Sequence, residues 1–139
     1  MIRKFLYISM LFFVSTNLFA KSEYVKQGID LYNKKKFEDA KFKFEQDIVY
    51  NPKSELSYLY LSKIFNKQDK KNLEEKNLNT VILLNPKNEE AILNLAFLKI
   101  RKSNYEETKK LIKNFKDVCK KLCEKQSYLQ NKLDSVLKK

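Results

Sequence analysis

The positions of apolar residues along the chain predict helices. Two amphipathic stretches each end at an Asn-Pro pair, Asn51-Pro52 and Asn85-Pro86, and the two pairs lie 34 residues apart. Proline cannot continue a helix, so each pair marks a turn after a helix. Gly28 is the only glycine and the two turn markers are the only prolines, which leaves no strand-and-turn pattern. The sequence therefore predicts an all-α chain with a repeated helical unit.

A second landmark supports the same repeat. Residues 36–40, Lys-Phe-Glu-Asp-Ala, recur as residues 104–108, Asn-Tyr-Glu-Glu-Thr, and Phe37 and Tyr105 are separated by 68 residues, twice the first spacing. A period of 34 is that of the tetratricopeptide repeat (TPR), a pair of antiparallel helices that must stack on neighbours to bury its apolar faces. The alternative is an unrelated helical bundle whose turns happen to recur.

Over about residues 21–120 the chain resembles the TPR family. The first repeat fits the family pattern at Tyr24, Gly28, Leu31, Ala40, Phe44 and Pro52. The second repeat fits at Tyr58, Leu61, Ser62, Phe65, Leu78, Val81 and Pro86, and the third at Leu95, Ala96, Tyr105, Ile112 and Phe115. The second repeat departs from the pattern at Glu74, which stands where the first repeat has Ala40. The third repeat has Lys99 where an aromatic residue is usual and Lys120 where the closing proline is usual. The resemblance implies a short α-solenoid of about three helix-turn-helix repeats, residues 21–54, 55–88 and 89–122.

The segment after the third repeat lacks repeat landmarks but keeps apolar residues at helical spacing: Tyr128, Leu129, Leu133, Val136 and Leu137. The last repeat of an array needs a terminal element with a polar outer face. We therefore expect residues 123–139 to form a C-terminal capping helix. The alternative is a coiled-coil segment for self-association.

The amino terminus has the layout of a secretory signal peptide. Arg3 and Lys4 precede an apolar run over residues 5–14, and a short segment ending in Ala20 follows it. We expect residues 1–20 to be removed and the protein to be exported to the periplasm or cell envelope, or secreted. The alternative is an inner-membrane anchor through residues 5–20, which falls short of the ~20 apolar residues of a spanning helix.

Charge restricts the partners only weakly. The net charge is +12, and removal of residues 1–20 leaves 27 basic and 17 acidic residues. A basic surface can meet acidic protein, anionic membrane or nucleic acid. Export argues against nucleic acid, and lysines spread along every predicted helix are typical of a solvated surface.

The chain is poorly equipped for catalysis. It has no histidine, no Gly-rich phosphate loop and no recognisable acidic active-site pair. Two cysteines without histidine cannot complete the four-coordinate site of structural zinc unless a glutamate or a second chain contributes ligands. We expect no enzyme activity, no cofactor, no metal and no small-molecule substrate.

Cys119 and Cys123 allow two interpretations. In the repeat frame they flank Lys120, where a turn is expected, so a disulfide could hold that turn in place of a proline. Alternatively, apolar residues at helical spacing without glycine or proline allow one unbroken helix from about Tyr105 to Leu137. On that helix the cysteines would be small buried apolar residues, because a bridge would be strained.

Similarity to the TPR family implies that the first helix of each repeat lines a concave groove. Family correspondence and helical spacing place these residues there: Val25, Ile29 and Tyr32 from the first repeat, Leu56, Leu59, Tyr60 and Lys63 from the second repeat, and Leu93, Asn94, Phe97, Ile100 and Arg101 from the third repeat. This surface is mostly apolar and aromatic, which suits an amphipathic helix or extended peptide. The alternative is that the terminal helix folds back over these residues.

TPR relatives that hold the acidic carboxyl termini of heat-shock chaperones use Lys, Asn and Arg at five groove positions. The residues here are Val25, Ile29, Tyr60, Glu90 and Asn94. We therefore expect no recognition of such acidic tails. The predicted function is a non-catalytic adaptor or scaffold module of the bacterial cell envelope that binds another protein. The alternative is a basic structural protein that self-associates or binds a membrane surface.

Overall fold

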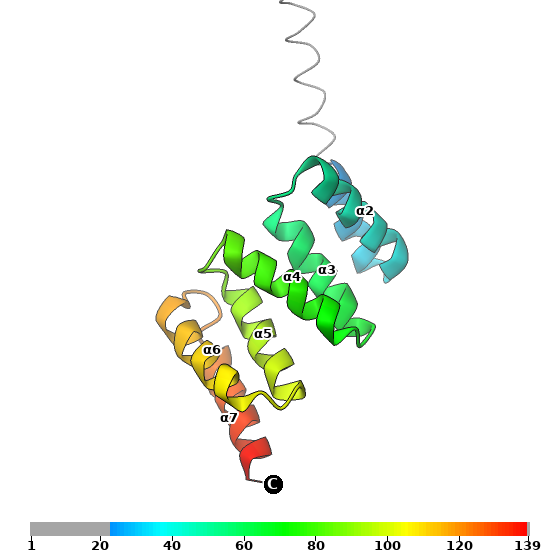
Figure 1. Ribbon diagram of the computed structural model, residues 1–139. Coiled ribbons are helices and arrows are strands. Elements are labelled where there is room, and N and C mark those ends of the chain that lie inside the picture. The colour runs from blue at the N-terminus through cyan, green and yellow to red at the C-terminus, as the bar shows by residue number, and fades with distance from the viewer. Residues whose placement is uncertain (1–22, 139) are drawn as a thin grey trace, which may run out of the picture. The chain divides into compact units, whose positions relative to one another are not determined.

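The computed structural model describes residues 23–138, and in this range the chain is helical with short connections. Residues 23–33 form a helix, and the helices that follow are α2 (Phe37–Tyr50), α3 (Glu55–Lys67), α4 (Lys71–Leu84), α5 (Glu89–Arg101), α6 (Tyr105–Val118) and α7 (Lys125–Leu137) (Figure 1). The predicted signal peptide lies outside the described residues. Among residues 23–138, no helix combines the length and apolar character needed to cross a membrane.

The chain divides into two compact units, and the division falls within α3. The first unit ends at Leu61 and the second begins at Ser62. The first therefore contains the helix over residues 23–33, α2 and the start of α3, and the second contains the rest of α3 and the helices after it.

The 34-residue period is visible in the backbone of the turns that join paired helices. Lys35, Asp69 and Ser103 occur 34 residues apart and have positive φ values of 60°, 52° and 56°. The N–H group of the next residue donates a 2.9 Å hydrogen bond back to the carbonyl five positions earlier in all three turns. This is the Schellman arrangement, in which a left-handed residue ends the helix and satisfies its free carbonyls. The same stop signal thus recurs without glycine.

The turns between repeats use the Asn-Pro pairs. The carbonyl of Asn51 accepts a hydrogen bond from the N–H of Ser54, and the carbonyl of Asn85 accepts one from Asn88, both at 3.0 Å. Asn88 also caps α5, since its side chain accepts a 2.7 Å hydrogen bond from the N–H of Ala91. Each Asn-Pro pair therefore lies just after the end of a helix, as predicted from sequence.

In the first unit, the core depends on the close approach of Gly28 to Phe44. Phe44 and Ala40 of α2 are fully buried, and a Cβ atom on Gly28 would lie 2.7 Å from Cε1 of Phe44. Glycine is thus required here by space. The buried Asp47 joins α2 to α3 because the hydroxyl of Ser57 donates a 2.6 Å hydrogen bond to its carboxylate.

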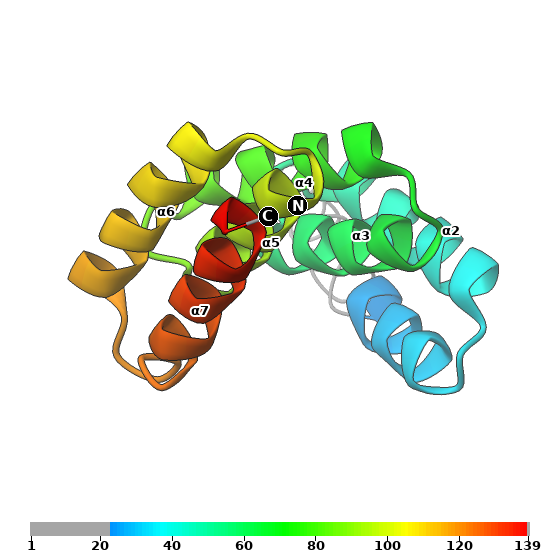
Figure 2. The ribbon, with the colours of Figure 1, turned by 90° about the horizontal axis from the view of Figure 1, so that it is seen from below.

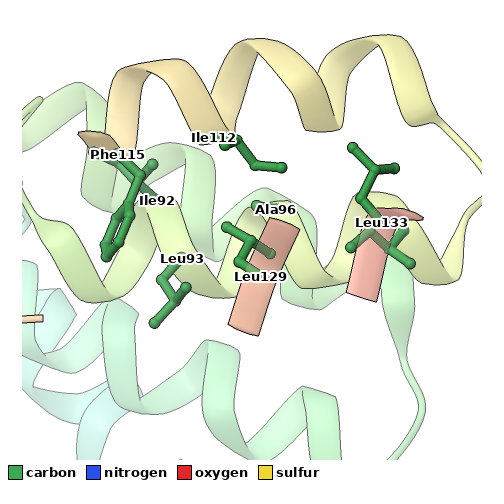
Figure 3. Packing of buried hydrophobic residues seen from close by; sticks show 8 residues of the cluster. Ile92, Leu93, Ala96, Ile112, Phe115, Leu129 and Leu133 are labelled. Carbon is green, nitrogen blue, oxygen red and sulfur yellow. The ribbon is translucent and has the colours of Figure 1, made fainter. Parts of the chain in front are cut away.

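In the second unit, α5, α6 and α7 share one apolar core. Figure 3 shows side chains from all three helices meeting, and the buried cluster comprises Ile92, Leu93, Ala96, Ile100, Ile112, Phe115, Leu129 and Leu133. Leu129 and Leu133 of α7 are almost completely buried, and α7 lies beside α6 in Figure 2. The C-terminal segment thus caps the array, as its apolar spacing predicted.

Of the two interpretations of the cysteines, the disulfide at a turn is the one that the structure contains, and the alternative of one unbroken helix from Tyr105 to Leu137 is wrong. Helix α6 ends at Val118, α7 begins at Lys125, and a disulfide joins Cys119 to Cys123 in the connection. Cys123 is exposed rather than buried beneath the terminal helix. The physical reason is geometric: side chains four residues apart on a helix keep their Cβ atoms about 5–6 Å apart, wider than a disulfide permits.

Candidate functional site

In the first unit, the predicted groove residues centre on an aromatic group. The rings of Tyr32 and Tyr60 meet edge to face with centroids 5.1 Å apart, and Tyr60 also stacks on the buried Phe44 at 5.0 Å. Tyr32 has Phe37 as a second neighbour at 5.5 Å. Both tyrosines are half-buried, so they are packed against neighbours and remain partly accessible to solvent. Packed aromatic side chains of this kind bind at little cost in side-chain entropy.

The other predicted residues of this unit differ in exposure. Val25 and Ile29, on the helix over residues 23–33, are half-buried, and Leu56 on α3 is exposed. Leu59 is buried, so the prediction that it lines an open groove is wrong. A partner on this unit would meet the two tyrosines and three aliphatic residues.

In the second unit, the surface of α5 combines an ion pair with an aromatic pair. The ammonium of Lys63 on α3 lies 2.7 Å from the carboxylate of Glu90 on α5. Further along α5, Phe97 contacts Tyr128 of α7, with ring centroids 5.7 Å apart. Asn94 is half-buried and lies one helical turn from each of Glu90 and Phe97. This surface offers aromatic edges and one neutralised ion pair.

Leu93 and Ile100 do not line an open groove. Both are buried in the core that α5 forms with α6 and α7. The prediction was wrong for these residues because α7 packs against α5 and covers part of the surface that the helical spacing of α5 alone left open. The alternative in which the terminal helix covers predicted groove residues therefore holds for this part of the second unit.

Tyr128 is a surface residue that the groove prediction omitted. Its side chain is 60% exposed although it contacts Phe97. The prediction took groove residues only from the first helices of repeats, and Tyr128 belongs to the cap. Its place in the sequence offered one signal, because it precedes Leu129 and so falls outside the α7 stripe of Leu129 and Leu133 that faces the core.

The predicted groove residue Arg101 is bound within the chain. One of its guanidinium nitrogens lies 2.6 Å from a carboxylate oxygen of Glu74, and the other carboxylate oxygen accepts a 2.8 Å hydrogen bond from the side chain of Asn66. The Glu74 side chain is only 3% exposed, whereas that of Arg101 is 37% exposed. Glu74, which stands where the first repeat has the small Ala40, is thus a buried carboxylate that holds α5 against α4.

A second ion cluster lies beside it, centred on the buried Lys99. Its ammonium is 2.6 Å from Glu75 and 2.7 Å from Glu107, and Lys102 lies 2.6 Å from the other oxygen of Glu75. Hydrogen bonds from Lys102 and then Lys99 lower the pKa of Glu75 below its ordinary 4.5. Burial acts to lower the pKa of Lys99, but hydrogen bonds with Glu107 and Glu75 leave it raised above 10.5. The cluster therefore ties α4, α5 and α6 together.

The connection between α6 and α7 is fixed to the start of α5. Backbone N–H groups of Lys121 and Leu122 donate hydrogen bonds of 3.0 and 2.8 Å to the carboxylate of Glu89. The donor from Leu122 is the main cause that lowers the pKa of Glu89. A carboxylate in the first turn of a helix also suits the helix dipole. Glu89 thus organises the same connection that the disulfide closes.

Known structures identify the fold. The TPR2B domain of yeast Sti1, solved with pHsp70, matches with a TM-score of 0.78 at 14% identity, covering 84% of this chain and 98% of that one. The Yersinia enterocolitica type III secretion chaperone SycD, solved with a peptide of the translocator YopD, matches with a TM-score of 0.75 at 14% identity. The match covers 83% of this chain and 90% of SycD. The second TPR domain of human RPAP3, solved with the HSP70 peptide SGPTIEEVD, matches with a TM-score of 0.74 at 17% identity. The match covers 88% of this chain and 99% of that domain.

The fold is that of TPR domains. The prediction of a short α-solenoid of TPR-like repeats with a capping helix is therefore confirmed. No protein family model matches the sequence, and no curated protein matches it.

Proposed function

We propose that this chain is a non-catalytic protein-interaction module of the cell envelope that binds a peptide or an amphipathic helix of another protein. The observation that carries the proposal is the TPR fold combined with half-exposed aromatic rings on the first helices of its repeats, Tyr32 and Tyr60 in the first unit and Phe97 in the second. The similar domains of Sti1, SycD and RPAP3 were solved with pHsp70, with a peptide of YopD and with an HSP70 peptide, respectively.

The polar groups of these surfaces favour an apolar partner. In the second unit, Lys63 is neutralised by Glu90 and Arg101 by Glu74, so neither basic group is a strong free site for a carboxylate. Aromatic and aliphatic side chains then dominate what a ligand would contact. A helix or extended segment with apolar residues at regular spacing fits this chemistry.

The same groups argue against acidic chaperone tails. At the five positions where relatives place Lys, Asn and Arg, the first unit carries Val25, Ile29 and Tyr60, and the second carries Glu90 and Asn94. Only Asn94 is one of these residue types, and it stands at a position where the relatives use another. The carboxylate of Glu90 is paired with Lys63, so this position offers no positive charge to the terminal carboxylate of such a peptide. We expect fluorescently labelled SGPTIEEVD, the peptide in the RPAP3 structure, to show no saturable binding in an anisotropy titration. Saturable binding that salt weakens would refute this assignment.

The partner is tested by affinity capture from an envelope extract of the host organism. A protein that depends on the aromatic surfaces should be recovered by the wild-type chain and lost with Tyr60→Ala or Phe97→Ala. Val49→Ala and Leu83→Ala are matched controls, since they remove exposed apolar side chains from second helices. Equal recovery by folded surface variants and by the controls would overturn the proposal.

Export rests on the sequence of the first 20 residues and is tested separately. The intact mass of the protein isolated from its host should correspond to a chain that begins at Lys21, and the protein should be found outside the cytoplasmic fraction. A full-length mass in the cytoplasmic fraction would refute the envelope role and leave the peptide-binding proposal standing.

A further inference from the structure

The connection between α6 and α7 is closed by an accessible disulfide. Residues 119–124 lie between the two helices, and the Cα atoms of Cys119 and Cys123 are 5.2 Å apart. Cys123 is exposed and Cys119 is half-buried, so a small reductant can reach the sulfur atoms. The bridge thus spans most of the connection that determines where α7 points.

The sequence of this connection is compatible with a helix, and the bridge opposes it. The six residues between Val118 and Lys125 are Cys-Lys-Lys-Leu-Cys-Glu, and the segment over 105–137 contains neither glycine nor proline. Lys, Leu and Glu are good helix formers. A disulfide needs Cβ atoms about 3.5–4.5 Å apart, whereas a helix keeps residues at this spacing about 5–6 Å apart. The bridge and a continuous helix therefore exclude each other.

Apart from the bridge, the turned connection is held by hydrogen bonds to Glu89, and a straightened helix can replace them. Glu89 accepts hydrogen bonds from the N–H groups of Lys121 and Leu122. In a continuous helix those two donors would instead bond to carbonyls four residues earlier, so straightening leaves no backbone donor unsatisfied. The carboxylate of Glu89 lies at the surface and would be solvated by water.

The apolar face of α7 opposes straightening within a single chain. Leu129 and Leu133 pack into the core of α5 and α6, with Val136 beside them. A straightened helix would carry these residues away and would also expose the surface that they cover. A second copy of the chain supplies a helix with the same residues at the same spacing, so reciprocal exchange restores the buried contacts of Leu129 and Leu133.

We propose that reduction of the Cys119–Cys123 disulfide lets α6 and α7 join into one helix, and that two copies then exchange their α7 segments to form a domain-swapped dimer. A dithiol supplies two electrons and two protons. The sulfur–sulfur bond breaks, two thiols form, and the dithiol becomes a cyclic disulfide. The oxidised chain keeps α7 on its own core and stays monomeric. The exchange is independent of whether a peptide partner binds the aromatic surfaces.

Size-exclusion chromatography with light scattering tests the change of state, using the full chain as isolated from its host. The oxidised protein should elute as a monomer over the whole concentration range. After incubation with dithiothreitol, a dimer should appear and its fraction should rise with concentration. Cys119→Ser combined with Cys123→Ser should dimerise without reductant. Reduced wild-type protein that stays folded and monomeric at every concentration would overturn the proposal, and this arm needs no variant to fold.

A cross-linking experiment separates exchange from side-by-side association. In the variant without native cysteines, Phe97→Cys and Tyr128→Cys place thiols on α5 and α7, at positions whose rings are 5.7 Å apart in the wild type. A short bis-maleimide should link α5 of one copy to α7 of the other and give a covalent dimer on a denaturing gel. Each single-cysteine variant controls for random linkage. A dimer in light scattering whose links stay within single chains would refute the exchange.

Discussion

Glu74 and Arg101 form one ion pair, but substitution of either residue alone should lower the stability of the protein by a different amount. The two partners differ in burial, because the side chain of Glu74 is 3% exposed and that of Arg101 is 37% exposed. Removal of Arg101 strands the buried carboxylate with only the side-chain N–H of Asn66. Removal of Glu74 leaves two groups that water can reach. The more exposed residue is therefore the one whose loss should destabilise more.

The magnitudes follow from the cost of a buried unpaired charge. Loss of one partner of a buried ion pair typically costs about 3–5 kcal/mol, and the partial exposure of Arg101 places Arg101→Ala at about 3 kcal/mol. Glu74→Ala introduces the residue that the first repeat carries and should cost about 1 kcal/mol in lost hydrogen bonds. The double variant removes the stranded charge and should cost about as much as Glu74→Ala, which implies a coupling of about 3 kcal/mol between the two residues.

Urea denaturation gives the free energy of unfolding of the wild type and the three variants. Circular dichroism and tyrosine fluorescence should report the same transition, and the m value should stay constant, before the energies are compared. Lys109→Ala is the control, because it breaks an exposed pair with Glu106 and should change stability by less than about 0.5 kcal/mol. If Arg101→Ala destabilises no more than Glu74→Ala, the argument from burial is refuted.

Three further predictions concern stability. Gly28→Ala should cost about 1–3 kcal/mol in thermal or urea unfolding, because its methyl group would lie 2.7 Å from the ring of Phe44; an unchanged stability would show that the ring moves freely. Lys35→Gly should stabilise the chain by a few tenths up to about 1 kcal/mol by relieving a left-handed backbone, and a loss of stability would contradict the assigned turn. Hydrogen bonding to Lys102 is the main cause of the lowered pKa of Glu75. Ionised Glu75 therefore stabilises the fold at a pH above its ordinary pKa of 4.5, and this stabilisation is lost as the pH falls through the lowered pKa. The difference in unfolding free energy between wild type and Glu75→Gln should therefore shrink with acidification, and a difference independent of pH would refute this origin.

Local features of the sequence were enough to predict the helices and the repeat. The Asn-Pro pairs end helices in any context because proline has no N–H group and restricts the residue before it, so their spacing fixed the period directly. The small Gly28 and the apolar stripe of the last helix likewise predicted packing positions that the structure contains. The left-handed residues of the helix-ending turns could not be predicted, because Lys35, Asp69 and Ser103 are chemically unrelated.

Only tertiary contacts decided which residues form the surface. Helical spacing assigned Leu93 and Ile100 to a groove, but α7 buries them, and no pattern within α5 contains that information. By itself the sequence determined an all-α repeat chain, because helix period and turn chemistry act over a few residues. The tertiary structure decided that Glu74 is a buried ion-paired charge, because its partner Arg101 comes from another helix. It also decided between the two interpretations of the cysteines, because Glu89 of α5 binds the connection in which the bridge forms.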